Sequence, residues 1–340
     1  MIWLTWRQFR GQALTAATVL VAVAILLGVT GPNVANQYAA SGLADCQGDG
    51  CASAASAFLG QLQTGGLVHV VYPLGLVIIL ATPALLGIFW GAPLIARELE
   101  TGTYRLAWSQ SVTRTRWLTV KLALAGLAAM AVTEALTLMH AWWAVPISKA
   151  IALGGNASVL GGNQFSWLAF ATTGITPLGY AAFAFALGTA VGALIRRAVP
   201  AMAVTLAIFA VVQVPMPLWV RPVIIPPASA IATLDAAQVN YRSLTAGVVP
   251  GQPAAWVVSS HAINAAGQPV TALPASCIPD NPSAKIDPGP CLDKLGIREV
   301  ISYQPASRYW PIQLIETGIF LALALALAAF CFWLLGRRRA

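Results

Sequence analysis

The sequence predicts an all-α polytopic membrane protein with six transmembrane helices, an N-terminal interfacial helix and a large external loop between spans five and six. Composition is the first indication: 58% of the 340 residues are hydrophobic, 9% are charged, and the mean hydropathy is +0.74. The second is a set of apolar runs that reach the roughly 20 residues a helix needs to cross a bilayer. Six runs qualify, at residues 13–32, 67–95, 117–146, 166–195, 200–220 and 312–335.

Residues 1–12 predict an interfacial connecting helix before the first span. Large apolar side chains recur there at helical spacing with two arginines on the other side, a pattern typical of a helix at headgroup depth. The apolar positions are Ile2, Trp3, Trp6 and Phe9, and the basic ones are Arg7 and Arg10. This helix is either a simple anchor or an element that transmits motion. No small-residue cleavage site follows, so we expect the first span to remain as a signal anchor.

The distribution of charge predicts the orientation, because basic residues are retained on the cytoplasmic side of membrane proteins. With both termini and the loops after spans two and four inside, the inner side carries 12 basic residues and two acids. The outer segments carry seven of each, and two acids remain within spans. The net charge of +8 therefore indicates how the chain is oriented in the membrane, and not that it binds nucleic acid. We expect a multi-pass protein of the bacterial cell membrane with both termini cytoplasmic.

The segment between spans two and three carries an ordered polar pattern. It reads Arg97-Glu98-Leu99-Glu100-Thr101-Gly102-Thr103 and, after Arg105, continues as Ser111-Val112-Thr113-Arg114-Thr115-Arg116-Trp117. This pattern resembles the permeases of ATP-binding-cassette exporters of the second type, especially the six-span actinobacterial ones. The resemblance implies a coupling helix at about residues 96–112 that docks into a separate ATPase subunit.

The resemblance also implies partners and coupling residues. It implies two copies of an ATPase that bind ATP and Mg, a second permease copy or paralogue, and no cofactor or nucleic acid on this chain. The implied coupling residues are Arg97, Glu98, Glu100, Gly102, Thr103 and Arg105. The alternative interpretation of the two glutamates is solvated surface charge.

Local physical chemistry adds expectations for this segment. Gly102 readily takes a left-handed conformation and should end the helix that carries the glutamates. Thr113 can cap the next helix, and Lys121 can snorkel to the membrane interface. We expect Glu98 and Glu100 to lie far from any membrane cavity.

Two spans carry residues that shape helices and their packing. Pro83, inside the second span, removes a backbone hydrogen bond and should kink the helix. In the fourth span, Gly188 and Gly192 follow Ala184 at intervals of one turn, which lets helices approach closely. Such a stripe indicates packing within the bundle more often than a dimer seam.

Ionisable and polar residues inside spans are candidates for function, because they are costly in a bilayer. Glu134, Thr137, His140 and Gln213 fall in the outer halves of their spans, and we expect them to line a pathway for cationic or polar amphiphilic cargo if they converge. The equal alternative for Glu134 is a buried, paired structural acid. For Glu316, near the outer end of the sixth span, the structural interpretation is favoured.

Residues 221–311 predict a folded external cap rather than a plain connector, because about 90 residues are too many for a structureless loop. Short apolar runs such as 255–258 suggest strands, and residues 312–340 follow as the sixth span with a basic cytoplasmic tail. Cysteines fall in pairs in the two outer loops, as Cys46 with Cys51 and Cys277 with Cys291, which predicts two disulfides in an oxidising compartment. Zinc is the less favoured alternative, and Cys331 stands alone in the sixth span.

The sequence contains no phosphate-binding Gly-x-x-x-x-Gly-Lys-Ser/Thr motif and no hydrolase or zinc-protease motif. We therefore expect a non-catalytic permease subunit of an exporter for amphiphilic, drug-like, peptide or lipid cargo, with ATP hydrolysis on a partner chain. Two alternatives stay open: a proton-coupled carrier that uses Glu134, and a membrane sensor or immunity protein built around the cap.

Overall fold

The computed structural model describes residues 2–48, 50–64, 66–102, 113–155, 164–234, 247, 249–252, 254–272, 274–277 and 289–337. The chain divides into two compact units. The membrane unit comprises Met1–Leu218 and Pro311–Ala340, and the sheet unit comprises Trp219–Trp310.

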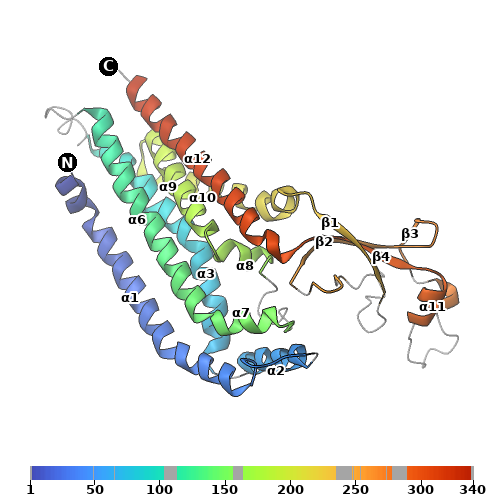
Figure 1. Ribbon diagram of the computed structural model, residues 1–340. Helices are drawn as coiled ribbons and strands as arrows, with labels where there is room; N and C mark the ends of the chain where they lie inside the picture. The colour runs from blue at the N-terminus through green and yellow to red at the C-terminus, as the bar shows by residue number, and fades with distance from the viewer. Residues whose placement is uncertain are drawn as a thin grey trace. The chain divides into compact units, whose positions relative to one another are not determined.

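The membrane unit is a bundle of long apolar helices (Figure 1). Among the described residues, six helical stretches are long and apolar enough to cross a membrane, which confirms the predicted fold class. The stretches are Phe9–Ala40, Val68–Thr101, Thr115–Trp143, Thr176–Ile195, Ala198–Val223 and Ala306–Gly336. The elements that form them are α1 (Ile2–Ala40), α3 (Val68–Leu86), the π-helix η1 (Gly87–Gly91), α4 (Ala92–Thr101), α6 (Arg114–Trp143), α9 (Thr176–Ile195), α10 (Ala198–Gln213), the π-helix η3 (Met216–Val220) and α12 (Tyr309–Arg337). The fifth and sixth stretches also include two 3₁₀ turns that belong to the sheet unit, η4 (Arg221–Val223) and η6 (Ala306–Arg308).

Several boundaries differ from those expected. Residues 2–12 are the first part of α1 rather than a separate helix, and Arg7 lies over the Trp3 ring at 5.5 Å from its centroid. The helix continues through Pro83, and the irregularity follows it as the π-turn of η1. Pro146 ends no span; it lies in the first turn of a new short helix, α7 (Val145–Ala152), because proline suits that position.

The expected fourth span, 166–195, is two helices instead of one. α8 (Trp167–Thr172) ends where Thr173 is extended and Gly174 has a φ of +66°, and α9 begins at Thr176. The side chain of Gln313 on α12 bonds to backbone groups on both sides of this break. Its Oε1 accepts hydrogen bonds from the amides of Ile175 and Thr176 at 3.1 and 3.0 Å, and its Nε2 donates to Phe170 O and Thr173 O at 3.2 and 3.1 Å.

α9 is the central helix of the bundle, with most of its side chains buried against its neighbours. Its glycine stripe packs against η1 and α4 of the same chain. A Cβ at Gly188 would lie 2.2 Å from the carbonyl oxygen of Gly87, and one at Gly192 would lie 2.3 Å from that of Ala92. The stripe therefore serves packing within the bundle, the interpretation favoured over a dimer seam.

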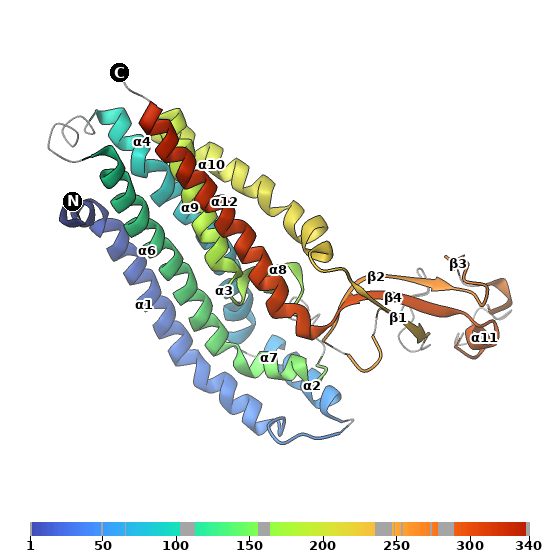
Figure 2. The ribbon, with the colours of Figure 1, turned by 45° about the horizontal axis from the view of Figure 1, so that its top comes forward.

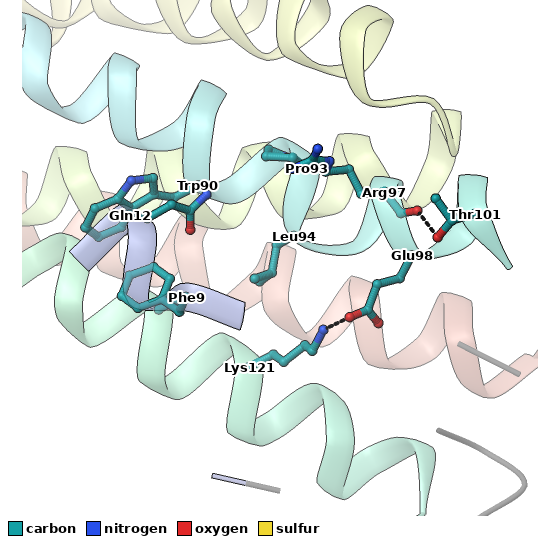
Figure 3. A pocket seen from close by; sticks show the side chains of 10 residues that line it. Phe9, Gln12, Trp90, Pro93, Leu94, Arg97, Glu98, Thr101 and Lys121 are labelled. Carbon is teal, nitrogen blue, oxygen red and sulfur yellow. Dashed lines mark hydrogen bonds and ion pairs between the residues drawn. The ribbon is translucent and has the colours of Figure 1, made fainter. Parts of the chain in front are cut away.

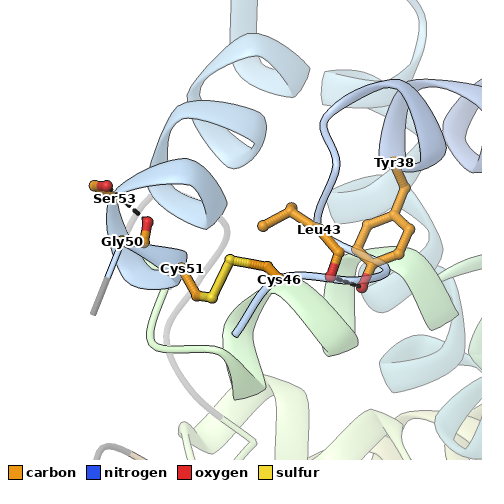
Figure 4. The surroundings of a disulfide bond; sticks show 6 residues. All are labelled: Tyr38, Leu43, Cys46, Gly50, Cys51 and Ser53. Atoms are coloured by element: carbon orange, nitrogen blue, oxygen red, sulfur yellow. Dashed lines mark hydrogen bonds between the residues drawn. A yellow bond between two sulfur atoms is a disulfide. The ribbon is translucent and has the colours of Figure 1, made fainter. Parts of the chain in front are cut away.

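The two ends of the bundle differ. Both termini lie at the same end as the C-terminal end of α4, whereas α7 and α2 (Cys51–Thr64) lie at the other end (Figures 1 and 2). At that second end, a disulfide between Cys46 and Cys51 joins the segment after α1 to the start of α2, with the two Cα atoms 5.8 Å apart (Figure 4). This bond confirms the first predicted pair.

The sheet unit contains a four-stranded antiparallel sheet in the order β1-β4-β2-β3. The strands are β1 (Ala228–Thr233), β2 (Trp256–Ile263), β3 (Pro269–Val270) and β4 (Arg298–Gln304), so the expected strand around 255–258 exists. Short α11 (Gly289–Lys294) carries Cys291, which is bonded to Cys277 with the Cα atoms 5.6 Å apart, as predicted. Gln304 of central β4 is buried and donates to Ile225 O and Pro222 O, so the sheet is bonded to the start of the unit.

Candidate functional site

The polar end of α4 is the candidate site, because the sequence pattern of coupling residues begins there. α4 continues the second span through η1, so residues 96–101 extend the span rather than open a separate helix. Gly102 follows with a φ of +73°, and the predicted left-handed end of the helix is confirmed. Thr103, Arg105 and the rest of the predicted coupling helix lie outside the described residues.

Glu98 forms an ion pair with Lys121 of α6, 23 residues further along the chain (Figure 3). The Lys121 side chain is only 5% exposed and that of Glu98 15% exposed. The ammonium group also lies 4.9 Å from the centroid of the Trp117 ring, a cation–π contact. The expectation that Lys121 snorkels to the interface is therefore wrong. Its charge is balanced within the bundle, where a lone ammonium group would be costly.

Glu100 bonds to a different helix. Its Oε2 accepts a hydrogen bond from the backbone amide of Ala198 at 3.2 Å. Ala198 is the first residue of α10, and Arg197, which precedes it, supplies no side-chain cap. An unpaired amide and the positive end of the helix dipole both favour a carboxylate at this position. Glu100 therefore caps α10 from another helix.

Between the two glutamates, Leu99 points into an apolar cluster. It packs against buried side chains that come from α4, α6, α9 and α12. These are Ile95, Trp117, Leu118, Ala190, Ala193, Cys331 and Leu335. Three consecutive residues thus attach the end of α4 to most of the bundle.

A cleft of about 340 Å³ opens beside the same helix end, between α1, α4 and α6 (Figure 3). Its walls include Arg97, Glu98 and Lys121 at one end and Phe9 and Trp90 at the other. The expectation that Glu98 lies far from any membrane cavity is therefore wrong. The sequence could not reveal this, because the cleft is lined by residues of α1, α4 and α6, which are far apart in the chain.

The polar residues expected to line an outer pathway mostly bond within the bundle. Thr137 Oγ1 donates to Thr133 O of its own helix at 3.0 Å, and a His140 ring nitrogen lies 3.3 Å from Tyr72 O. The space beside His140 is about 40 Å³ with otherwise apolar walls, room for no more than a few water molecules. Glu134 is half-buried, and its Oε2 has no hydrogen-bond partner among the described residues. Gln213 is the last residue of α10, whereas Glu134, Thr137 and His140 are on α6. The role of these residues as a cargo pathway stays a prediction.

A polar joint connects α9 and α12; the sequence favoured a structural role for Glu316 but indicated neither its partner nor the role of Gln313. Glu316 is fully buried and accepts a hydrogen bond from the Tyr180 hydroxyl of α9. One turn away, Gln313 closes the break before α9, and the Thr176 hydroxyl also donates to its Oε1. The available signal was the pair Gln313 and Glu316 at a spacing of three in an otherwise apolar helix, which places both on one face.

Six spans with two termini at one end define a multi-pass membrane protein. The model of one family, described as ABC-2 membrane transporter related, matches residues 17–221, more than half of the chain. The chain therefore belongs to the ABC-2 membrane transporter related family and is an ABC-2-type permease, a class that partners an ABC ATPase. Comparisons with curated proteins and with solved structures give no match.

Proposed function

We propose that this permease is the membrane subunit of an ATP-driven exporter that moves amphiphilic, drug-like, peptide or lipid cargo outward across the cell membrane. The observation that carries the proposal is the attachment of the α4 end to α6 by Glu98 and to α10 by Glu100. A helix end bonded to two other spans is suited to converting a displacement by a bound ATPase into a rearrangement of the bundle.

The proposed cycle uses the residues beyond Gly102 as the contact with the ATPase. Two ATPase subunits bind ATP and Mg, close on each other, and displace this contact on each of two permease chains. Through α4 the displacement reaches α6 and α10, and cargo access changes from the inner to the outer leaflet. In this scheme the Glu98–Lys121 ion pair lies within the permease and Thr103 and Arg105 meet the ATPase.

A proton-coupled carrier is the second candidate, favoured by one observation. The half-buried Glu134 carboxylate has an oxygen without a partner in the described part of the chain. An acid of this kind within a span is suited to binding a proton or a cationic cargo group. In the exporter, the same group would contribute to cargo affinity and not to the energy source.

The test is cargo-stimulated ATP hydrolysis and export by the purified permease–ATPase complex in proteoliposomes. Glu98→Gln keeps an acceptor for Lys121 but removes the charge, and charge-assisted hydrogen bonds contribute about 1.5–3 kcal/mol. We expect normal membrane insertion and basal hydrolysis but loss of cargo stimulation and export. The double variant Glu98→Lys with Lys121→Glu restores the ion pair and should recover part of both.

Glu134→Gln is the contrasting variant. We expect it to change the cargo concentration for half-maximal stimulation and to leave basal hydrolysis unchanged. The proposal fails if Glu98→Gln exports normally while a protonophore stops transport at constant ATP, the result expected of the proton-coupled carrier.

A further inference from the structure

We propose that the cleft between α1, α4 and α6 binds an anionic phospholipid from the leaflet at the end of the bundle where α4 terminates. This inference goes beyond the exporter function, because it depends only on the location of the protein in a membrane. It applies to the permease with or without an ATPase. Three features of the cleft favour this ligand: the order of residues along it, its charge, and the exposed apolar side chains of α1.

The chemistry of the cleft changes from apolar to polar along η1 and α4, which are continuous. Trp90, Leu94, Arg97 and Thr101 recur at intervals of three to four residues, so one face of the helix lines the cleft. Trp90 lies deeper in the bundle and packs edge-on against Phe9 of α1, with ring centroids 4.8 Å apart. Eleven residues separate Trp90 from Thr101, roughly 16 Å along a helix. The cleft is apolar inside the bundle and polar at its end. This order matches a lipid in that leaflet, whose headgroup lies at the membrane surface and whose acyl chains point towards the bilayer centre.

The charge of the cleft selects an anion. The only carboxylate among the described residues that line it, Glu98, is already paired with Lys121, so these two charges cancel. Arg97 is exposed, and no described carboxylate lies within ion-pair distance of it. The wall therefore carries one uncompensated positive charge, on a planar group that binds phosphate oxygens in a bidentate manner. Among the described lining residues, no unpaired carboxylate remains for a cationic ligand.

A helix that lines the cleft also carries exposed apolar side chains. α1 forms one wall, and its outward side chains, such as Leu14 and Val21, are exposed apolar groups suited to acyl chains. A volume of about 340 Å³ is at the small end of ligand sites. It holds a headgroup and the first part of a chain, and the rest of the lipid remains in the bilayer. Gln12 donates to Phe89 O at 3.0 Å, so α1 is bonded to the π-turn that borders the cleft.

The experiment measures lipid binding to the delipidated permease in detergent by native mass spectrometry, without ATPase or ATP. The probes are phosphatidylglycerol, phosphatidylcholine and inorganic phosphate. We expect phosphatidylglycerol to bind about tenfold or more tightly than phosphatidylcholine, a factor that corresponds to roughly 1.4 kcal/mol. Arg97→Gln should abolish this preference. Leu94→Trp fills the apolar part of the cleft and should weaken the binding of both lipids.

Arg197→Gln is the matched control, because Arg197 is an exposed arginine at the same end of the bundle that does not line the cleft. It should keep the full preference. The proposal is overturned if the two lipids bind equally, if both arginine variants lose the preference to the same extent, or if excess inorganic phosphate displaces phosphatidylglycerol. Because neither transport nor hydrolysis is measured, the exporter function can fail while this result stands.

Discussion

The close approach of α9 to the π-turn gives a sharp prediction for Gly188→Ala. The new Cβ would lie 2.2 Å from Gly87 O and 2.8 Å from the amide nitrogen of Ala92, whereas ordinary contact begins near 3.4 Å. The shortfall of about 1.2 Å is against backbone atoms, so no side-chain rotation relieves it. α9 must instead move away from η1 and α4.

This movement should destabilise the bundle. Overpacking of a close-packed interior typically costs about 1–3 kcal/mol. For a unit of this size, each kcal/mol lowers the midpoint of thermal unfolding by roughly 2–4 °C. Thermal unfolding of the detergent-solubilised permease, followed by tryptophan fluorescence, measures the change.

Gly318→Ala on α12 is the matched control, because nothing lies within 4 Å of the Cβ it adds. Alanine is favoured over glycine in a helix by up to about 1 kcal/mol. The control should therefore be neutral or slightly stabilising, opposite in sign to Gly188→Ala. The reasoning is refuted if Gly188→Ala unfolds at or above the wild-type temperature, or if both variants shift equally.

Three further predictions concern other parts of the chain. Cys277→Ser opens the loop to Cys291 and should destabilise the sheet unit by about 3 kcal/mol on the chain-entropy estimate, measured by limited proteolysis against temperature; equal protection of wild type and variant would contradict it. Gln313→Leu leaves one buried and one partly buried amide without an acceptor and should cost about 2 kcal/mol in thermal unfolding, so an unchanged midpoint would refute the role of the side chain at the helix break. Cysteine labelling in intact cells should modify an engineered site near Ser260 but not one near Thr103, and the reverse pattern would overturn the topology.

Features set by local sequence were predictable, because the residues that determine them are neighbours in the chain. The left-handed end at Gly102 was predicted, as was the cap of α6 at Thr113, whose hydroxyl accepts from the Arg116 amide at 3.3 Å. The six spans followed from continuous apolar runs in the sequence. The two disulfides followed from cysteine pairs in segments expected to face the oxidising side of the membrane.

Features that join distant residues were not predictable. The partner of Glu98 depends on how α4 and α6 are rotated about their axes, and no local pattern contains that rotation. For the same reason Gln313 gave no sign that it closes a break some 140 residues earlier in the chain. The fourth span was expected as one helix because its apolar run is continuous, and the effect of Gly174 was overlooked.

The short connection between α9 and α10 has a consequence for how the chain is made. Only Arg196 and Arg197 separate the two helices, and Arg196 takes a left-handed conformation with a φ of +61° while its amide donates to Gly192 O at 3.0 Å. α9 is among the least apolar of the six spans, with a mean hydropathy of 1.8, and most of its surface is covered by protein in the finished bundle.

Such a helix gains little from lipid alone, because its alanines and glycines contribute less to membrane insertion than leucine or phenylalanine. A two-residue link means that α10, with a mean hydropathy of 2.0, leaves the ribosome immediately after it. We therefore expect the pair to enter the bilayer together as a helical hairpin during synthesis. After that, α12 is the remaining span that must pack against α9 to complete its surroundings.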